Sequence, residues 1–250
     1  MKKYTLVLLT ATVLSSSIIA MEAIELTPDA IRAHFANPSM GAQRPFYNLD
    51  YVKAALDLGA VGVGAAHPDL YESAVAIVKA GLAPTVGANG LNYYDADFIA
   101  LAKDLSFSRT DFQSLLAAAV RDSLSHPTIC ADGRNYYQTE LVALGLDRGV
   151  VGVGAAHADL YDSARAILLN ELTNPGTCAS GRYFEPQYME MAKTQLADAE
   201  INGAFMNAIR EILGNPMSGP VPYDQDLLGY IRDNQVVFPQ DILDKVAAIS

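Results

Sequence analysis

Apolar residues recur three and four positions apart over most of the chain, and this spacing predicts amphipathic helices. The pattern comes in pairs: a helix over 49–56 is followed by one over 70–78, and a helix over 98–105 by one over 112–119. Pro68 stands where the first residue of a helix belongs. The second helices end before prolines, because the residue that precedes proline avoids the helical conformation; these are Pro38, Pro127, Pro175 and Pro216. No segment reads as a convincing strand, so we expect an all-α protein.

The chain also repeats itself. Residues 61–74 recur as 151–164 with 12 of 14 positions identical. Aromatic pairs mark smaller units within each copy, with spacings of 47, 43 and 47 residues; they are Phe46-Tyr47, Tyr93-Tyr94, Tyr136-Tyr137 and Tyr183-Phe184. A unit of this length with two helices is typical of helical-pair solenoids.

We therefore predict one domain over 24–250, built as a right-handed-type, α-solenoid-like array of helical pairs. About four units would form two halves, at 42–130 and 131–219, and 220–250 would add a partial unit. Such units bury their apolar faces against their neighbours, so the array would behave as one cooperative domain.

The first twenty residues have the layout of a secretory signal peptide. Lys2 and Lys3 precede an apolar stretch that runs to Ala20, and cleavage is expected after Ala20 or Ala23. Thr and Ser interrupt this stretch, which disfavours an uncleaved anchor, and no second segment is long enough to span a membrane. We expect a soluble, exported protein, periplasmic or secreted. Its formal net charge of −11 disfavours a nucleic-acid partner.

An oxidising compartment would permit a disulfide between the two cysteines, Cys130 and Cys178. They occupy matching places in consecutive units, which lie on the order of 10 Å apart in a regular stack of helices. Disulfides need Cα atoms closer than about 7 Å. The sequence leaves the pairing open.

The repeated Gly-rich segment is the first candidate site. It reads Gly59 to His67 in one half and Gly149 to His157 in the other. Glycines there allow close packing of connectors or helices, which is the preferred interpretation. The alternative is a pair of equivalent binding sites with His67, Asp69, Tyr71, His157, Asp159 and Tyr161. A metal site would need the two His and two Asp side chains to meet at one place.

The turns before the aromatic pairs are the second candidate site. Arg134 and Arg182 precede two of the pairs, and Tyr94 and Tyr137 belong to two of them. The preferred interpretation is structural, with the aromatic rings fixing the turns against the helices. The alternative is a row of Arg and Tyr side chains that binds anions, glycans or a peptide.

No catalytic signature stands out in the sequence. We expect a helical-repeat binding protein without enzymatic activity and without a cofactor, presenting a surface to a protein or peptide. Two alternatives stay open: a metal-dependent enzyme or metal-binding protein that uses His67, Asp69, His157 and Asp159, and a carrier of an apolar ligand between the Gly-rich connectors. The oligomeric state cannot be derived from the sequence.

Overall fold

The computed structural model describes residues 26–40, 45–60, 67–87, 90–129, 134–149, 152–178, 181–215 and 223–249, without the side chains of 58–60, 177–178 and 181–183. The predicted signal peptide and residues 61–66 of the first Gly-rich segment lie outside this description. The described part of the chain is mostly helical, which confirms the all-α prediction. None of its helices is long and apolar enough to cross a membrane.

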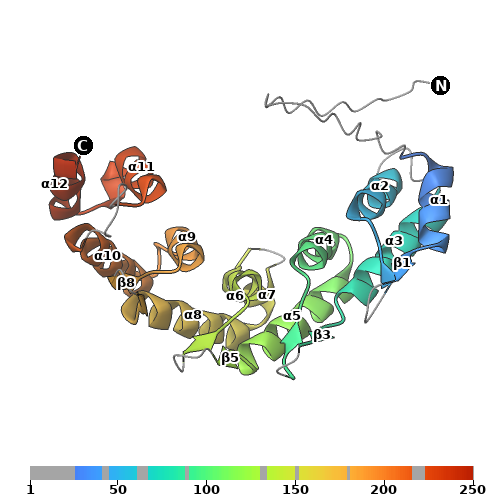
Figure 1. Cartoon of the computed structure of the whole chain (residues 1–250), viewed down its shortest axis with the longest axis horizontal. Coiled ribbons are helices and arrows are strands. Elements are labelled where there is room, and N and C mark those ends of the chain that lie inside the picture. The colour runs from blue at the N-terminus through green and yellow to red at the C-terminus, as the bar shows by residue number, and fades with distance from the viewer. Residues whose placement is uncertain are drawn as a thin grey trace.

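The helices form two layers along an arc, with the N-terminal and C-terminal helices at its two tips (Figure 1). We call the helices on the concave side the inner helices: α2 (Leu49–Ala60), α4 (Ala96–Ser106), α6 (Thr139–Leu146), α9 (Pro186–Thr194) and α11 (Gln225–Asp233). The outer helices are α1 (Pro28–Ala36), α3 (Pro68–Gly81), α5 (Thr110–Ser125), α8 (Ala158–Thr173), α10 (Ala199–Gly214) and α12 (Gln240–Ile249).

Each inner helix packs on the outer helix that follows it in the chain. Outer helices also pack on one another: α1 on α3, α5 on α8, α8 on α10 and α10 on α12. Two short helices complete the fold: α7 (Val153–Ala156) lies between α6 and α8, and the 3-10 helix η2 (Gln235–Val237) lies between α11 and α12. Pro68 does begin α3, and α1, α5, α8 and α10 end just before the residue that precedes a proline, as predicted.

The apolar core runs between the two layers along the arc. It is built from matching helix positions, because the third, fourth and seventh residues of an inner helix share one face. That face is turned to the outer helices. The fourth residues are all buried, and they are Val52, Ile99, Val142, Met189 and Leu228.

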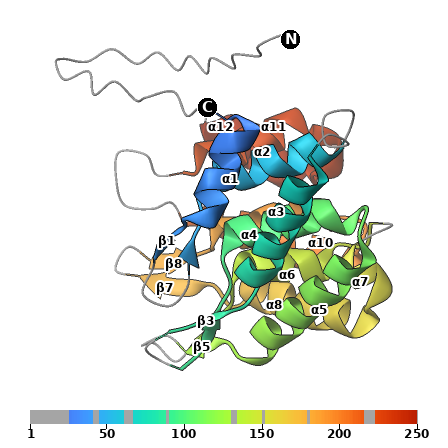
Figure 2. The same cartoon turned by 90° about the vertical axis from the view of Figure 1, so that its right-hand side faces the viewer.

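Four short β-hairpins connect outer helices to the inner helices that follow, so the expectation of no strands was wrong. The strands are β1 (Ser39–Met40) with β2 (Pro45–Phe46), β3 (Thr85–Val86) with β4 (Asn92–Tyr93), β5 (Thr128–Ile129) with β6 (Asn135–Tyr136), and β7 (Gly176–Cys178) with β8 (Gly181–Tyr183). Each strand has two or three residues, too few for an alternating pattern to show in the sequence. Figure 2 shows the hairpins along one edge of the arc and α7 at the opposite edge.

Candidate binding surfaces

Asp69 is the second residue of α3, and its carboxylate is bound by the preceding outer helix. Arg32 of α1 donates from Nε to Asp69 Oδ2 at 2.9 Å. The same guanidinium lies 3.2 Å from Nδ1 of His67. The hydrogen bond from Arg32 lowers the pKa of Asp69. The first His–Asp pair is therefore joined to an arginine of the scaffold.

Asp159 occupies the equivalent place in α8. Arg121 of α5 donates from Nη2 to Asp159 Oδ2 at 3.0 Å, and this bond lowers the pKa of Asp159. Among the described residues, His157 has no contact that matches the one between Arg32 and His67. The two carboxylates thus have like surroundings in the two halves, whereas the two histidines differ.

These two contacts belong to a longer series, which we call the outer ladder. In each outer helix from α3 on, the acidic second residue is bound by a basic side chain of the preceding outer helix. The pairs are Arg32–Asp69, Lys79–Asp111, Arg121–Asp159, Arg165–Glu200 and Arg210–Asp241. Arg165 also binds Asp198, the residue before α10, with its Nε 2.6 Å from Oδ2. This bond lowers the pKa of Asp198 to about 2.

A metal site from the two His–Asp pairs finds no support in this arrangement. The pairs stand at the starts of α3 and α8, and α5 lies between these helices in the outer layer (Figure 1). In the part of the chain that the structure describes, no three His, Cys, Asp or Glu side chains are grouped so as to hold a metal ion.

In the second half, two glycines of the Gly-rich segment, Gly152 and Gly154, lie where backbones approach closely. A side chain at Gly154 would begin 2.4 Å from the carbonyl oxygen of Gly145. At Gly152 it would begin 2.2 Å from the carbonyl oxygen of Asp147. These contacts let α7 pack on α6, which favours the packing interpretation for this copy. The space beside both glycines is filled by protein.

The two tyrosines of the repeated segment also serve different contacts. Tyr161 is buried, with 4% of its surface exposed, and the Arg148 guanidinium lies 3.4 Å from the centre of its ring. Tyr71 is half-buried and packs against the apolar core of the first half.

The predicted Arg–Tyr row is largely occupied by internal contacts. Arg134 donates to Glu171 Oε2 at 2.7 Å and to the Asn174 carbonyl at 3.0 Å. Tyr94 is 8% exposed and donates its hydroxyl proton to Asp122, so it is not part of an exposed ridge. Tyr137 is half-buried, and its hydroxyl accepts from Asn135 at 3.4 Å. The side chains of Arg182 and Cys178, and all of Cys130, lie outside the described residues.

The inner helices carry acidic side chains at two further matching positions, which the sequence reasoning missed. Within a helix, positions two and nine lie opposite the buried face, so these side chains face the hollow of the arc. In α6 the ninth position is the residue that follows the helix. We call them the inner acidic rows. The second positions hold Asp50, Asp97, Glu140 and Asp226, and the ninth positions, counted from the first helical residue, hold Asp57, Asp104, Asp147 and Asp233.

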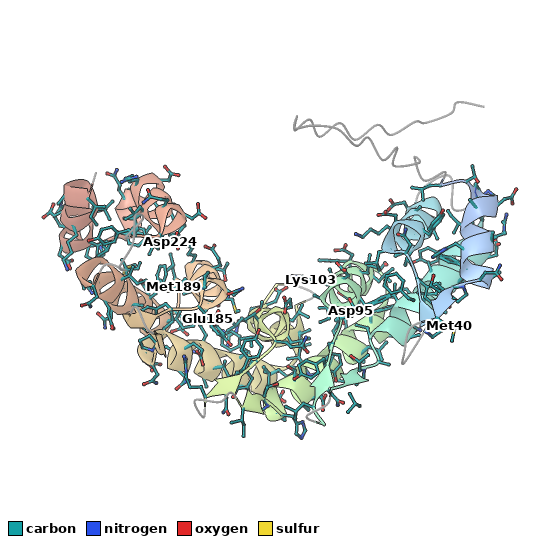
Figure 3. The ribbon with its side chains drawn as sticks, viewed as in Figure 1. Met40, Asp95, Lys103, Glu185, Met189 and Asp224 are labelled. Atoms are coloured by element: carbon teal, nitrogen blue, oxygen red, sulfur yellow. The ribbon has the colours of Figure 1, made fainter. Side chains whose placement is uncertain are left out.

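Within the described residues, only Asp147 of the inner acidic rows forms an ion pair, 3.2 Å from Lys103. Figure 3 shows Lys103 reaching toward the hollow between α4 and α6, and Asp95, Glu185 and Asp224 beside the inner helices that they precede. Asp95 and Asp224 each accept a backbone N–H of the helix they precede. Helix α9 interrupts both rows, with Gln187 and Thr194 at these positions.

Two cavities lie at matching places 90 residues apart. One, of about 410 Å³, lies between α2 and α4, and the other, of about 600 Å³, lies between α6 and α9. Most of their lining positions correspond: Lys53 and Ala143, Leu56 and Leu146, Asp57 and Asp147, Leu101 and Met191, Asp104 and Thr194, Leu105 and Gln195. The sequence signal for them was present in the recurrence of aspartate at the end of successive inner helices.

Comparisons with protein families, with curated proteins and with solved structures found nothing that matches this chain.

Proposed function

We propose that the chain is an exported helical-repeat protein without enzymatic activity, whose concave face binds an extended basic segment of another polypeptide. The units of the array would be the pairs of inner and outer helices. The observation that carries this proposal is the contrast between the many carboxylates of the inner acidic rows and the single ion pair found among them. A partner with cationic side chains would supply the missing counter-charges.

The spacing of the carboxylates favours a polypeptide over a compact ligand. Within a helix, positions two and nine are separated by about 10 Å, at 1.5 Å per residue. Neighbouring packed helices lie about 8–10 Å apart. A polyproline II segment rises about 9 Å for every three residues. A segment with Lys or Arg at every third residue would therefore place one cation at each inner helix.

A labelled peptide of about fifteen residues in that conformation is the direct probe. We expect one with Arg at every third position to bind more tightly than a peptide of the same composition with its arginines contiguous. Fluorescence anisotropy measures both affinities. Binding should weaken as the salt concentration rises, because the contacts are exposed and screened.

A matched pair of double variants locates the surface. Asp97→Asn with Glu140→Gln removes two inner carboxylates, and Asp162→Asn with Asp244→Asn removes two from outer helices. We expect the first to weaken binding roughly three- to tenfold, and the second to leave it nearly unchanged. Equal losses in both, or no preference for the spaced peptide, would show that only net charge matters and would overturn the proposal.

Export is proposed on the sequence alone. Expression of the full chain in a secreting host should give a mature protein that begins at Met21 or Ile24, read by intact mass. A chain that keeps Lys2 and Lys3 would contradict cleavage.

A further inference from the structure

The cavity between α6 and α9 has a polar feature that its counterpart cannot reproduce. Arg148 follows α6 at the cavity wall, with its guanidinium stacked over the buried ring of Tyr161. Stacking on an aromatic face holds the planar group in one orientation while its N–H donors stay at the edge. Position 58, which corresponds to Arg148 in the first half, is a leucine in the sequence.

The charges around this cavity leave Arg148 unmatched. Asp147 pairs with Lys103 at 3.2 Å, and Glu190 pairs with Lys193. Among the described residues, Arg148 forms no ion pair and no hydrogen bond. Helix α9 contributes Thr194 in place of the aspartate found at the same position of α4. Within the described residues, this cavity thus has one positive charge without an ion pair, whereas the first-half cavity has two aspartates without an ion pair, Asp57 and Asp104, beside Lys53.

We infer that the cavity between α6 and α9 is a site for a carboxylate attached to an apolar group. Arg148 would bind the carboxylate through two parallel N–H donors. The Gln195 amide directs one N–H to Thr194 at 3.2 Å, and its second N–H is a further donor at the wall. Leu146 and Met191 would contact the apolar part. The volume of about 600 Å³ is within the range of small-molecule sites. This inference does not depend on the inner acidic rows.

Such a carboxylate has two sources, a free organic acid and the C-terminus of a peptide. The probe for the first is 4-phenylbutyrate, with its uncharged amide as control. The probe for the second is a basic peptide with a free C-terminus, with the same peptide amidated as control. Because the chain has no tryptophan, calorimetry is the suitable measurement of affinity.

We expect each free acid that enters the site to bind at least about tenfold more tightly than its amide. Arg148→Gln should remove that preference, Arg148→Lys should keep part of it, and Lys245→Gln, which removes a cation from α12, should keep all of it. A preference limited to phenylbutyrate or to the peptide identifies the source. Acid and amide that bind equally, no binding of either acid, or a preference that survives Arg148→Gln would overturn the inference.

The Asp97→Asn and Glu140→Gln variant separates this result from the proposed function. It should weaken the spaced basic peptide and leave phenylbutyrate binding unchanged. Failure of one result therefore does not imply failure of the other.

Discussion

The second residue is acidic in the outer helices from α3 on and in every inner helix except α9, yet the two layers use it differently. In the outer helices from α3 on, Asp69, Asp111, Asp159, Glu200 and Asp241 are each bound by a basic residue of the preceding outer helix. In the inner helices, Asp50, Asp97, Glu140 and Asp226 have no ion-pair partner among the described residues.

Both sets gain from the positive end of their own helix, so helix formation alone does not distinguish them. The difference is the presence of a cation one outer helix earlier. The outer carboxylates therefore contribute to cohesion between neighbouring helices. The carboxylates of the inner helices repel one another, which raises the free energy of the folded protein. A cationic partner would neutralise this repulsion.

The largest expected effect comes from removing the best-connected cation of the outer ladder. Arg165 binds both Asp198 and Glu200, and about a quarter of its side chain is exposed. Arg165→Met keeps the aliphatic stem and should lower the free energy of unfolding by roughly 1–3 kcal/mol. Urea unfolding followed by circular dichroism measures it. A loss no greater than that of Lys245→Met, which removes an exposed cation of α12, would contradict a cohesive role.

Acid should weaken the same contact. The pKa of Asp198 is lowered to about 2 by the hydrogen bond from Arg165, so the pair stabilises the fold above the ordinary aspartate range and loses this as the pH falls from about 4 to 2. With screening by solvent, we expect roughly 1–2 kcal/mol from this group. Unfolding measured across this range should be less acid-sensitive in Arg165→Met than in the unmodified chain.

A charge exchange tests a more exposed pair. Arg121→Asp and Asp159→Arg should each lower the melting temperature, because each creates a like-charge contact between α5 and α8. The double variant restores an ion pair and should recover part of the loss. If the double variant loses the sum of the two single effects, Arg121 and Asp159 do not interact in solution.

The smallest effect is expected on the inner side. Glu140→Gln removes a carboxylate that has no ion pair among the described residues. It should change the melting temperature less than any outer-ladder variant, while weakening binding of the basic peptide. Scanning calorimetry beside the binding assay checks both. A clear loss of stability would mean that Glu140 has a structural partner.

Much of the helical plan could be predicted from the sequence because it depends on local signals. Periodic apolar residues located the helix pairs, and the prolines located the helix ends. The hairpins were not predicted because a strand such as Ser39–Met40 has too few residues to show an alternating apolar and polar pattern. The packing at Gly154 was anticipated because glycine permits close approach wherever it lies in a chain.

The side-chain partners could not be predicted in the same way. Asp69 next to His67 suggested a local site, whereas its actual partner, Arg32, comes from the preceding outer helix. Separations of 31 to 38 residues in the outer ladder vary with the lengths of the hairpins and connectors. Arg148 was overlooked because its stacking on Tyr161 depends on how the chain returns from α6 to α8.

The position of the outer ladder bears on how the arc would deform. Drawing its two tips together would stretch the convex side, where the ion pairs of the outer ladder join one helix to the next, while flattening the arc would leave these ion pairs under no tension. Each ion pair then limits how far the two outer helices that it connects can separate, and so limits how far the arc can bend inward at that point. We therefore expect the arc to open, with its two tips moving apart, more easily than it closes.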